Sequence, residues 1–431
     1  MGNCEAESAD ELNSYIIDQL TLAAEKHNVK LRGQSNSTRL EFLITDIAQE
    51  GQLVILLDEY DKPLINTLTT PEAEACRKVL RGFYSSIKKC DGNERFVFVT
   101  GASKFCHVSM FSGFNNPTDI STDYNYATMF GYTQKELEHY FAEHIDRACK
   151  QLNMPREELL SEIKAWYDGY KFHANGESVY NPVSLAEFFI HNAEFNNYWF
   201  STGTPTFLME LVKKKHFCFE NMLSSPVPSV AFEAFEIDDI DPVTLLLQTG
   251  YLTIKSMVRQ YNMPWYWLDF PNLEVNQSFN TFILNAYMKK SKRETVNFCK
   301  LLTDSMANGN MAQLRRSLEA FFAGITYDIH HKDHSNFQNI FFAVFHMLGV
   351  YIKSEQRTSD GRIDAVCETE KFVYIFEFKL NDDDTALEQI KAKEYFKQYL
   401  VSNKRIMIIG VNFNTDSGKI ADWKDEEILV R

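Results

Sequence analysis

Two charged side chains interrupt an apolar stretch near the C-terminal end of the chain. The segment 372–380 reads Phe-Val-Tyr-Ile-Phe-Glu-Phe-Lys-Leu, a pattern typical of a buried strand. Because strand side chains alternate, Glu377 and Lys379 share one face with Val373 and Ile375, and the phenylalanines between them take the other face. Charges in such surroundings cost several kcal/mol unless they are paired or bind a metal ion. The pattern therefore predicts a functional site.

An acidic residue precedes this strand by a short hairpin. The motif Gly361-Arg-Ile-Asp364 opens a predicted strand, and we expect Asp364 to lie near Glu377 so that both carboxylates bind one Mg²⁺ or Mn²⁺ ion. The metal would acidify a water molecule and neutralise the transition state, and Lys379 would steady the attacking water or the developing charge. This is the chemistry of phosphodiester hydrolysis. The alternative is a Glu377–Lys379 ion pair on an exposed edge strand.

Two polar residues follow on a helix that the sequence predicts over residues 386–400. This helix is expected to pack beside the strand that carries Glu377. Gln389 and Tyr395 would then hold a metal-bound water molecule.

Three histidines upstream of this region offer a different metal site. They are His330, His331 and His334, of which the first and last are four residues apart and would share a helix face. No acidic or cysteine partner of suitable spacing follows. A loop before the next predicted helix explains these histidines equally well.

A second group of polar residues follows two predicted parallel strands in the first third of the chain. The residues are Asp58, Glu59 and Asp61 after the run 53–57, and Thr100 after the run 96–99. Ligands of α/β sheets bind at such strand ends. In a P-loop NTPase this is the Walker B position, where an Asp holds Mg²⁺ and the next acid aligns water, with Thr100 placed to sense a γ-phosphate. Simple solvation of the strand ends is the alternative.

The phosphate-binding loop that a Walker B pair requires is absent from the sequence. No G-x-x-x-x-G-K-[ST] motif occurs, and the segment Gly33-Gln-Ser-Asn-Ser-Thr38 lacks both the second glycine and the lysine. Without such a nest of backbone N–H groups the phosphates have no cradle. We therefore do not expect this chain alone to hydrolyse ATP.

The elements that position these residues divide the chain into three stretches. Residues 1–130 alternate helices (9–24, 40–48, 71–87) with strands (53–57, 96–99), which predicts a βαβ unit with a parallel sheet. Residues 131–300 read as a mostly helical connector, with a capping box at Thr133 and Glu136 that opens a helix over 134–151. Residues 301–431 read as helix (340–348), strands (363–366, 372–378), helix (386–400) and strand (405–411). The fold class is α/β.

Composition sets the broad class of the protein. The 431 residues are 45% apolar and 24% charged, which is typical of a globular protein of two or three domains. The net charge of −15 argues against a nucleic-acid coat protein. Eight scattered cysteines form no C-x-x-C pair, so neither a zinc site nor a disulfide framework is predicted, and free thiols suit the cytoplasm. No apolar run is long enough to span a membrane.

Taken together, the motifs resemble one family, the bacterial predicted AAA-ATPase-like proteins fused to a C-terminal nuclease of the PD-(D/E)XK superfamily. The resemblance covers nearly the whole chain. It implies that residues 1–130 form an incomplete AAA-ATPase-like core, with a partial P-loop NTPase-like sheet and a Walker B pair at Asp58 and Glu59. It also implies that residues 301–431 form a restriction-endonuclease-like domain, with a nuclease core of Asp364, Glu377 and Lys379 that acts on DNA or RNA. The matching motifs are Leu56-Leu-Asp-Glu-Tyr-Asp-Lys-Pro63, Phe98-Val-Thr-Gly-Ala-Ser-Lys-Phe105, Phe111-Ser-Gly-Phe-Asn115, Trp166-Tyr-Asp-Gly-Tyr170, Tyr180-Asn-Pro182, Gln248-Thr-Gly-Tyr251, Pro271-Asn-Leu-Glu-Val275, Gly361-Arg-Ile-Asp364 and Phe376-Glu-Phe-Lys379.

The sequence departs from this family in two places. Relatives usually carry an Arg-rich Gly-Lys-Ser loop upstream of the point where this chain starts, so the resemblance predicts an N-terminally truncated member or the downstream piece of a split gene. Such a chain would work as a homo-oligomer or with a missing upstream polypeptide. Relatives also tend to carry a glutamate where His334 aligns, and histidine binds Mg²⁺ poorly, which puts a two-metal site in question.

Three functional hypotheses follow from the sequence. The first is a metal-dependent nuclease joined to an ATPase-like domain. The second is a non-catalytic module that senses nucleotides or docks a protein partner, which the acidic charge and the absent phosphate loop favour. The third is a product that folds incompletely, because a sheet without its first strands leaves an unpaired edge.

Overall fold

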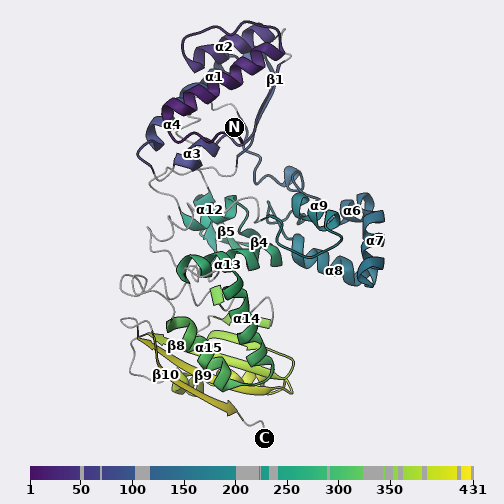
Figure 1. Ribbon diagram of the computed structural model, residues 1–431, viewed down its shortest axis with the longest axis vertical. Helices are drawn as coiled ribbons and strands as arrows, with labels where there is room; N and C mark the ends of the chain where they lie inside the picture. Colours follow the sequence, from purple (N-terminus) through teal and green to yellow (C-terminus); the bar gives the residue numbers. More distant parts are fainter. Residues whose placement is uncertain are drawn as a thin grey trace.

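The structure described is a computed structural model. The molecule is elongated, with the N-terminal unit at one end and a five-stranded sheet at the other (Figure 1). A helical arm projects sideways between them. The structure describes residues 1–48, 53–67, 70–101, 117–199, 223, 225–232, 241–288, 292–323, 343–344, 353–357, 363–380, 386–414 and 419–428. Its mixed α/β character agrees with the predicted fold class. None of the described helices combines the length and the apolar character needed to traverse a lipid bilayer.

The N-terminal unit is a βαβ arrangement covered by helices. Strands β1 (Leu53–Leu57) and β2 (Glu94–Val99) pair in parallel, as predicted, and α4 (Ala73–Lys89) connects them. Helices α1 (Ala9–Lys26) and α2 (Asn36–Ile47) pack with α4 into one hydrophobic core. The short helix α3 (Lys62–Thr67), which follows the acidic residues after β1, was not predicted.

The two-stranded sheet is buried on one face only, although a short apolar run such as 53–57 is typical of a strand buried on both faces. Ile55 and Leu57 pack against the helical core. On the opposite face the side chains of Val54 and Leu56 are 49% and 68% exposed. The apolar run alone could not reveal this difference, because α1, α2 and α4 place their apolar residues on one side of the sheet.

The arm consists of four helices around a small core of their own. These helices are α6 (Gln134–Tyr140), α7 (Ala142–Leu152), α8 (Arg156–Tyr167) and α9 (Pro182–Ile190). The predicted capping box is present, since Thr133 and Glu136 exchange side-chain and backbone hydrogen bonds. The single helix predicted over 134–151 is wrong in its extent, because the chain leaves helical geometry at Phe141, where φ is −109° and ψ is 16°.

The middle of the chain contains a three-stranded sheet that the sequence analysis did not predict. Its order is β3-β5-β4, formed by β3 (Val227–Pro228), β4 (Thr253–Gln260) and β5 (Met263–Asp269). Strands β4 and β5 form a hairpin whose two turn residues, Tyr261 and Asn262, have positive φ. Beside it lie α12 (Pro242–Gln248) and α13 (Leu273–Met288) (Figure 1). Helix α14 (Lys292–Ala307) packs on α13 and on α15 (Met311–Ala323), and α15 contacts β10 (Lys419–Ile428) of the C-terminal sheet.

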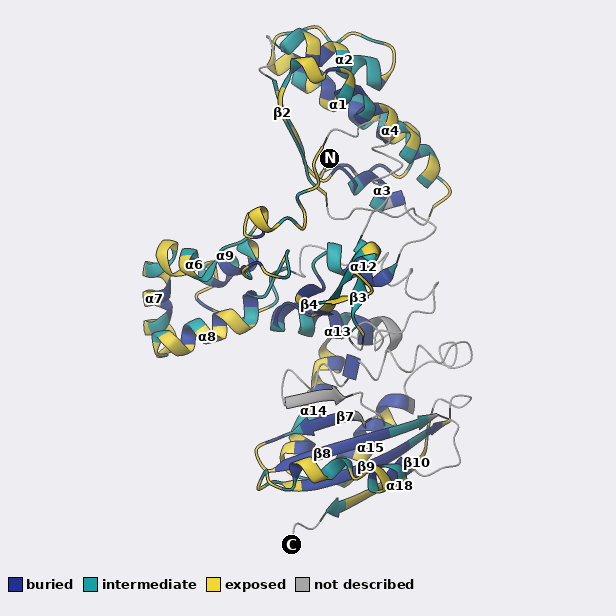
Figure 2. Cartoon of the chain, turned by 180° about the vertical axis from the view of Figure 1, so that it is seen from behind, coloured by how far each residue is buried: buried dark blue, intermediate teal, exposed yellow. Residues whose placement is uncertain are grey.

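The C-terminal sheet has five strands in the order β10-β9-β8-β7-β6. They are β6 (Lys353–Arg357), β7 (Ile363–Glu368), β8 (Phe372–Leu380), β9 (Arg405–Asn414) and β10 (Lys419–Ile428). Strands β8 and β9 pair in parallel, and the other pairs are antiparallel. Strands β8 and β9 are the most deeply buried part of this sheet (Figure 2). The sequence predicted β7, β8 and β9 but neither edge strand.

The helix that follows β8 is shorter than predicted. Helix α18 (Ala386–Lys393) ends where Glu394 adopts a left-handed conformation with φ of 53°, and residues Tyr395–Tyr399 form a separate 3₁₀ helix. Of the helix predicted over 340–348, the structure describes Ala343 and Val344, which are helical and buried.

Candidate active site

Glu377 lies in the interior of the C-terminal sheet. Its side chain is 2% exposed, and it sits on β8 with β7 on one side and β9 on the other. On β9 its partner in the register is Gly410. Since β8 is an interior strand, the alternative of an exposed ion pair on an edge strand is wrong.

The two faces of β8 pack as the alternation predicts. Val373 and Ile375 contribute to a hydrophobic cluster with Leu387 and Ile390 of α18. The aromatic residues between them, Phe372, Tyr374 and Phe376, join the larger core on the other side of the sheet. Glu377 therefore belongs to the face that α18 covers.

A glycine on β9 lets α18 approach the sheet next to Glu377. A Cβ atom added at Gly410 would lie 2.4 Å from the backbone N of Leu387, so no other residue fits there without moving the helix. This approach brings Gln389 to the carboxylate, and the Gln389 amide Nε2 donates a hydrogen bond to Oε1 of Glu377. The sequence analysis missed Gly410, although a glycine inside the apolar run Ile-Ile-Gly-Val is a signal of close backbone packing.

Lys379 is half-buried and lies two residues beyond Glu377 on the same strand. On β9 its partner in the register is Asn412. The structure therefore places one acid and one base on the same face of β8, near the end of the strand.

Tyr395 lies in the 3₁₀ helix rather than on the helix that carries Gln389. Its ring packs against the hydrophobic cluster under α18. Its hydroxyl group is buried and makes no hydrogen bond to any residue in the described part of the chain. Its predicted role beside the metal-bound water stays a prediction.

The predicted metal ligands are described in part. Asp364 lies on β7, one residue before Ala365, which pairs with Phe376 of β8, and its side chain is outside the described residues. The three histidines, His330, His331 and His334, also lie outside the described residues. In the part of the chain that the structure describes, no group of three or more His, Cys, Asp or Glu side chains could hold a metal ion. The Asp364–Glu377 metal pair stays a prediction.

Of the second predicted group of polar residues, Asp58, Glu59 and Thr100 lie together at the surface, where β1 and β2 end. The Thr100 hydroxyl donates to Oδ1 of Asp58 at 2.7 Å, and the backbone N of Glu59 donates to the same atom at 3.0 Å. Glu59 has a φ of 50°, and both acids are exposed. The amino group of Met1 donates to the backbone O of Asp58 at 2.8 Å.

Asp61, the third acid of this group, is fully buried at the start of α3. Its neighbour Tyr84 donates from its hydroxyl to the backbone O of Tyr60 at 2.9 Å. Burial, and then the charge of Asp61, raise the pKa of Tyr84. The structure thus separates Asp61, which belongs to the core of the N-terminal unit, from the exposed Asp58 and Glu59.

Comparison with known families identifies the two ends of the chain. Residues 332–423 match the model of the PD-(D/E)XK nuclease superfamily, and residues 1–111 match the model of a predicted AAA-ATPase. The first range includes Glu377, Lys379 and Gln389, and the second includes both strand-end residues Asp58 and Thr100. The chain belongs to the family of AAA-ATPase-like proteins that carry a C-terminal PD-(D/E)XK nuclease-superfamily domain.

A full-length relative supports this assignment. A protein of Azotobacter chroococcum mcd 1, described as an uncharacterized protein in the vnfD 5' region, is 35% identical over 434 residues. The match covers 97% of this chain and 81% of that protein. No solved structure matches the chain.

Proposed function

We propose that this protein is a metal-dependent nuclease that hydrolyses phosphodiester bonds in DNA or RNA with Mg²⁺ or Mn²⁺. The observation that carries the proposal is the burial of Glu377, which is 2% exposed on an interior strand of the domain that matches the nuclease superfamily. Burying a carboxylate is costly, and such residues recur where a metal or a reaction needs them.

The residues around Glu377 fit a divalent metal ion. Carboxylate oxygens are hard ligands, which Mg²⁺ and Mn²⁺ prefer, and Glu377 would hold the ion together with Asp364. The bound ion would supply positive charge and a more acidic water molecule. The hydrogen bond from Gln389 fixes the orientation of the Glu377 carboxylate, the role that outer hydrogen bonds play at metal sites.

Lys379 supplies the second charge of the mechanism. Its ammonium group, on the same face as Glu377, would neutralise negative charge that develops on the phosphate. Its half-buried position limits competition from water, which strengthens the interaction. The proposed mechanism thus depends on one carboxylate that holds the metal ion and one ammonium group that neutralises charge on the phosphate.

The test is a cleavage assay with the purified full-length protein. Single-stranded and double-stranded DNA and RNA are incubated with Mg²⁺, with Mn²⁺, or with a chelator. We expect metal-dependent cleavage of at least one substrate, and we expect Lys379→Ala to slow it at least about tenfold. The matched control is Lys371→Ala in the exposed turn before β8, which should cleave like the wild type. Absence of cleavage with both metals on all four substrates would overturn the proposal.

A further inference from the structure

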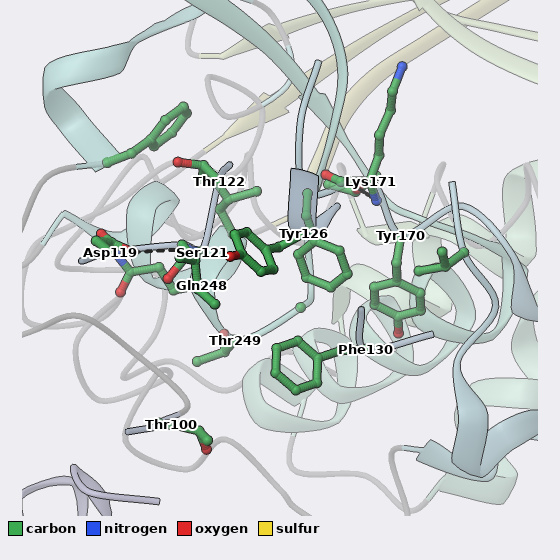
Figure 3. A pocket seen from close by; sticks show the side chains of 18 of the residues that line it. Thr100, Asp119, Ser121, Thr122, Tyr126, Phe130, Tyr170, Lys171, Gln248 and Thr249 are labelled. Carbon is green, nitrogen blue, oxygen red and sulfur yellow. Dashed lines mark hydrogen bonds between the residues drawn. The ribbon is translucent and has the colours of Figure 1, made fainter. Parts of the chain in front are cut away.

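A cavity of about 530 Å³ lies between the N-terminal unit and the middle of the chain. It is lined by the end of β2, by the segment 117–130 that leads to the arm, and by residues around Tyr170 and Gln248 (Figure 3). A cavity of this size suits a small molecule. It is built by other elements than those that carry Glu377, so the proposed nuclease mechanism does not use it.

One side of the cavity is aromatic. Figure 3 shows the rings of Tyr126, Phe130 and Tyr170 gathered there, and Trp199 also lines the cavity. Phe130 lies 6.3 Å from Phe98 of β2, measured between ring centroids, so the aromatic wall continues onto the end of the sheet. Such a wall favours a flat ring, which stacks on aromatic side chains whatever its substituents.

The other side is polar and short of charge. Asp119, Ser121 and Gln248 lie together in Figure 3, and the backbone N of Ser121 donates to Oδ1 of Asp119 at 2.9 Å. Hydroxyl and amide groups of this kind can both donate and accept hydrogen bonds at the edge of a heterocycle. The polar side therefore suits a ring with nitrogen and oxygen atoms at its edge.

The described lining of the cavity carries little charge. Among the described residues that line it, the charged ones are Asp119 and Lys171. The side chain of Lys171 extends away from the rings of Phe130 and Tyr170 (Figure 3). Phosphate chains are usually held by several cations, so the described lining suits an aromatic ring better than a triphosphate.

The backbone beneath the rings is held in place by direct hydrogen bonds. The Asn272 amide Nδ2 donates to the backbone O of Asp168 at 2.9 Å, and the backbone N of Lys171 donates to the Thr253 hydroxyl at 2.7 Å. Between them Gly169 has a φ of 104°, and a Cβ atom there would lie 2.1 Å from the backbone O of Pro271. The segment before Tyr170 is thus fixed against β4 and the start of α13.

The backbone at Trp199 is also held in place by direct hydrogen bonds. Oε1 of the buried Glu274 accepts hydrogen bonds from the backbone N atoms of Tyr198 and Trp199, at 2.6 and 2.8 Å. A Cβ atom added at Gly250, where φ is 82°, would lie 3.5 Å from the Tyr170 ring and 3.6 Å from the Trp199 ring. Both rings therefore close around one glycine, which makes the aromatic wall preorganised.

The hydroxyl group of Tyr170 lies behind the aromatic wall. It is buried, with the amides of Asn181 and Asn272 as its polar neighbours. Burial is the main reason that the pKa of this tyrosine is raised, so the hydroxyl keeps its proton.

From this cavity we propose that the protein binds a nucleobase between the aromatic wall and the polar side. The base would stack on the rings of Phe130 and Tyr170, and its edge would bond to Gln248 and Ser121. The same chemistry is found in a free nucleoside and in an unpaired base of a nucleic-acid strand. The site is separate from the nuclease site and does not depend on the proposed cleavage activity.

The test is calorimetric titration of the full chain with adenosine, guanosine, cytidine and uridine. We expect at least one nucleoside to bind with a Kd below about 1 mM. Ser121→Phe, which fills the cavity from an exposed loop position, should weaken that binding at least about tenfold. Met129→Phe is the matched control, because Met129 is exposed in the same loop and does not line the cavity, and it should bind as the wild type does.

Two further ligands, a single-stranded tetranucleotide and Mg²⁺–ATP, test whether the base comes from a nucleic acid and whether the site prefers a triphosphate. A four-nucleotide single strand that binds more tightly than its nucleoside would assign the site to nucleic acid, and equal or weaker binding would assign it to the free nucleoside. Either result supports the proposal. It would be overturned if none of the four nucleosides bound, if Ser121→Phe bound as well as the wild type, or if Mg²⁺–ATP bound more tightly than adenosine.

Discussion

The two acidic constellations of this molecule, one at each end of the chain, differ in what surrounds the carboxylate. Asp58 is exposed at the end of a two-stranded sheet and accepts hydrogen bonds from Thr100 and Glu59. Glu377 is buried on the interior strand β8 of a five-stranded sheet, where Gln389 donates to it. An exposed carboxylate at a strand end is satisfied by its neighbours and by water. A buried one needs a reason, and we propose a metal ion.

A third carboxylate sharpens this comparison. Glu274 is also fully buried, yet it accepts hydrogen bonds from two backbone N–H groups, at Tyr198 and Trp199, which it thereby holds in place. Burial alone does not mark a reactive acid. The difference is that the partners of Glu274 are backbone groups that need an acceptor, whereas Glu377 lies in a domain of the nuclease superfamily beside a lysine on the same face.

The largest expected effect is that of Glu377→Gln. The change keeps the size of the side chain and removes its charge, so the rate of nucleic-acid cleavage should fall at least about 10²-fold while the unfolding midpoint changes little. The measurement is the single-turnover cleavage rate in saturating Mg²⁺. Glu388→Gln, on the exposed side of α18, is the matched control and should keep its activity. Equal rates for both variants would remove the distinction between buried and exposed acids.

Gln389→Ala comes next in size. Loss of the amide that orients Glu377 should raise the Mg²⁺ concentration for half-maximal cleavage about 10- to 100-fold, and should lower the rate at saturating Mg²⁺ less. A titration of cleavage rate against Mg²⁺ measures both values. If the rate fell without any change in the Mg²⁺ requirement, Gln389 would act on the reaction rather than on the metal ligand. Glu388→Ala on the same helix serves as the control.

Glu274→Gln should change stability and leave cleavage intact. Burial raises the pKa of Glu274 above its usual 4.5, against the lowering effect of its hydrogen bonds from Trp199 and Tyr198. The folded state therefore binds this proton more tightly, so the stability that it contributes is present below about pH 4.5 and is lost as the pH rises through the raised pKa.

The measurement for Glu274 is urea unfolding from pH 4.5 to 7.5. The wild type should lose unfolding free energy relative to Glu274→Gln as the pH rises, by a total of about 1 kcal/mol. A difference between the two proteins that stays constant over this range would show that the carboxyl group keeps an ordinary pKa.

The smallest expected effect is that of Thr100→Val. The valine keeps the shape and removes the hydroxyl that donates to Asp58 on the surface, so the unfolding free energy should fall by no more than about 1 kcal/mol. Chemical denaturation measures this change, and cleavage should stay at the wild-type rate. A tenfold loss of cleavage would mean that the two ends of the molecule are coupled, contrary to the comparison drawn above.

The strands that the sequence revealed are β1 and β2 of the N-terminal unit and the three interior strands of the C-terminal sheet. The runs of β1, β8 and β9 are apolar and short, and this pattern survives whatever packs against them. The exposed face of β1 was missed, since burial depends on which side the helices take. The edge strand β10 was also missed, because its sequence Lys-Ile-Ala-Asp-Trp-Lys-Asp-Glu-Glu-Ile carries charges that suit an edge and resemble a loop.

The middle sheet was missed for a different reason. Strand β5 contains Pro264 near its start, and the turn between β4 and β5 is Tyr261-Asn262 without a glycine. Proline argues against a central strand, and the usual signal of a tight hairpin is Asn-Gly. Here the hairpin forms because both turn residues adopt positive φ, and no local sequence pattern indicates this conformation.

The candidate site was predictable where it depends on alternation and not where it depends on packing. The alternation of β8 placed Glu377 and Lys379 on one face, and Gln389 was expected beside them. The end of α18 at Glu394, which places Tyr395 elsewhere, depends on one left-handed residue. Gly410 matters through a contact between β9 and α18, and the glycine in its apolar run signals a close approach without indicating which element approaches.

The most direct test of the central claim is binding of Mn²⁺ to the full chain, measured by calorimetry without any substrate. The account predicts that the wild type and Glu388→Gln bind the ion with the same affinity, and that Glu377→Gln binds it at least about tenfold more weakly. Equal Mn²⁺ affinity in the wild type and Glu377→Gln, or no binding by the wild type, would contradict the claim that this buried carboxylate holds a metal ion.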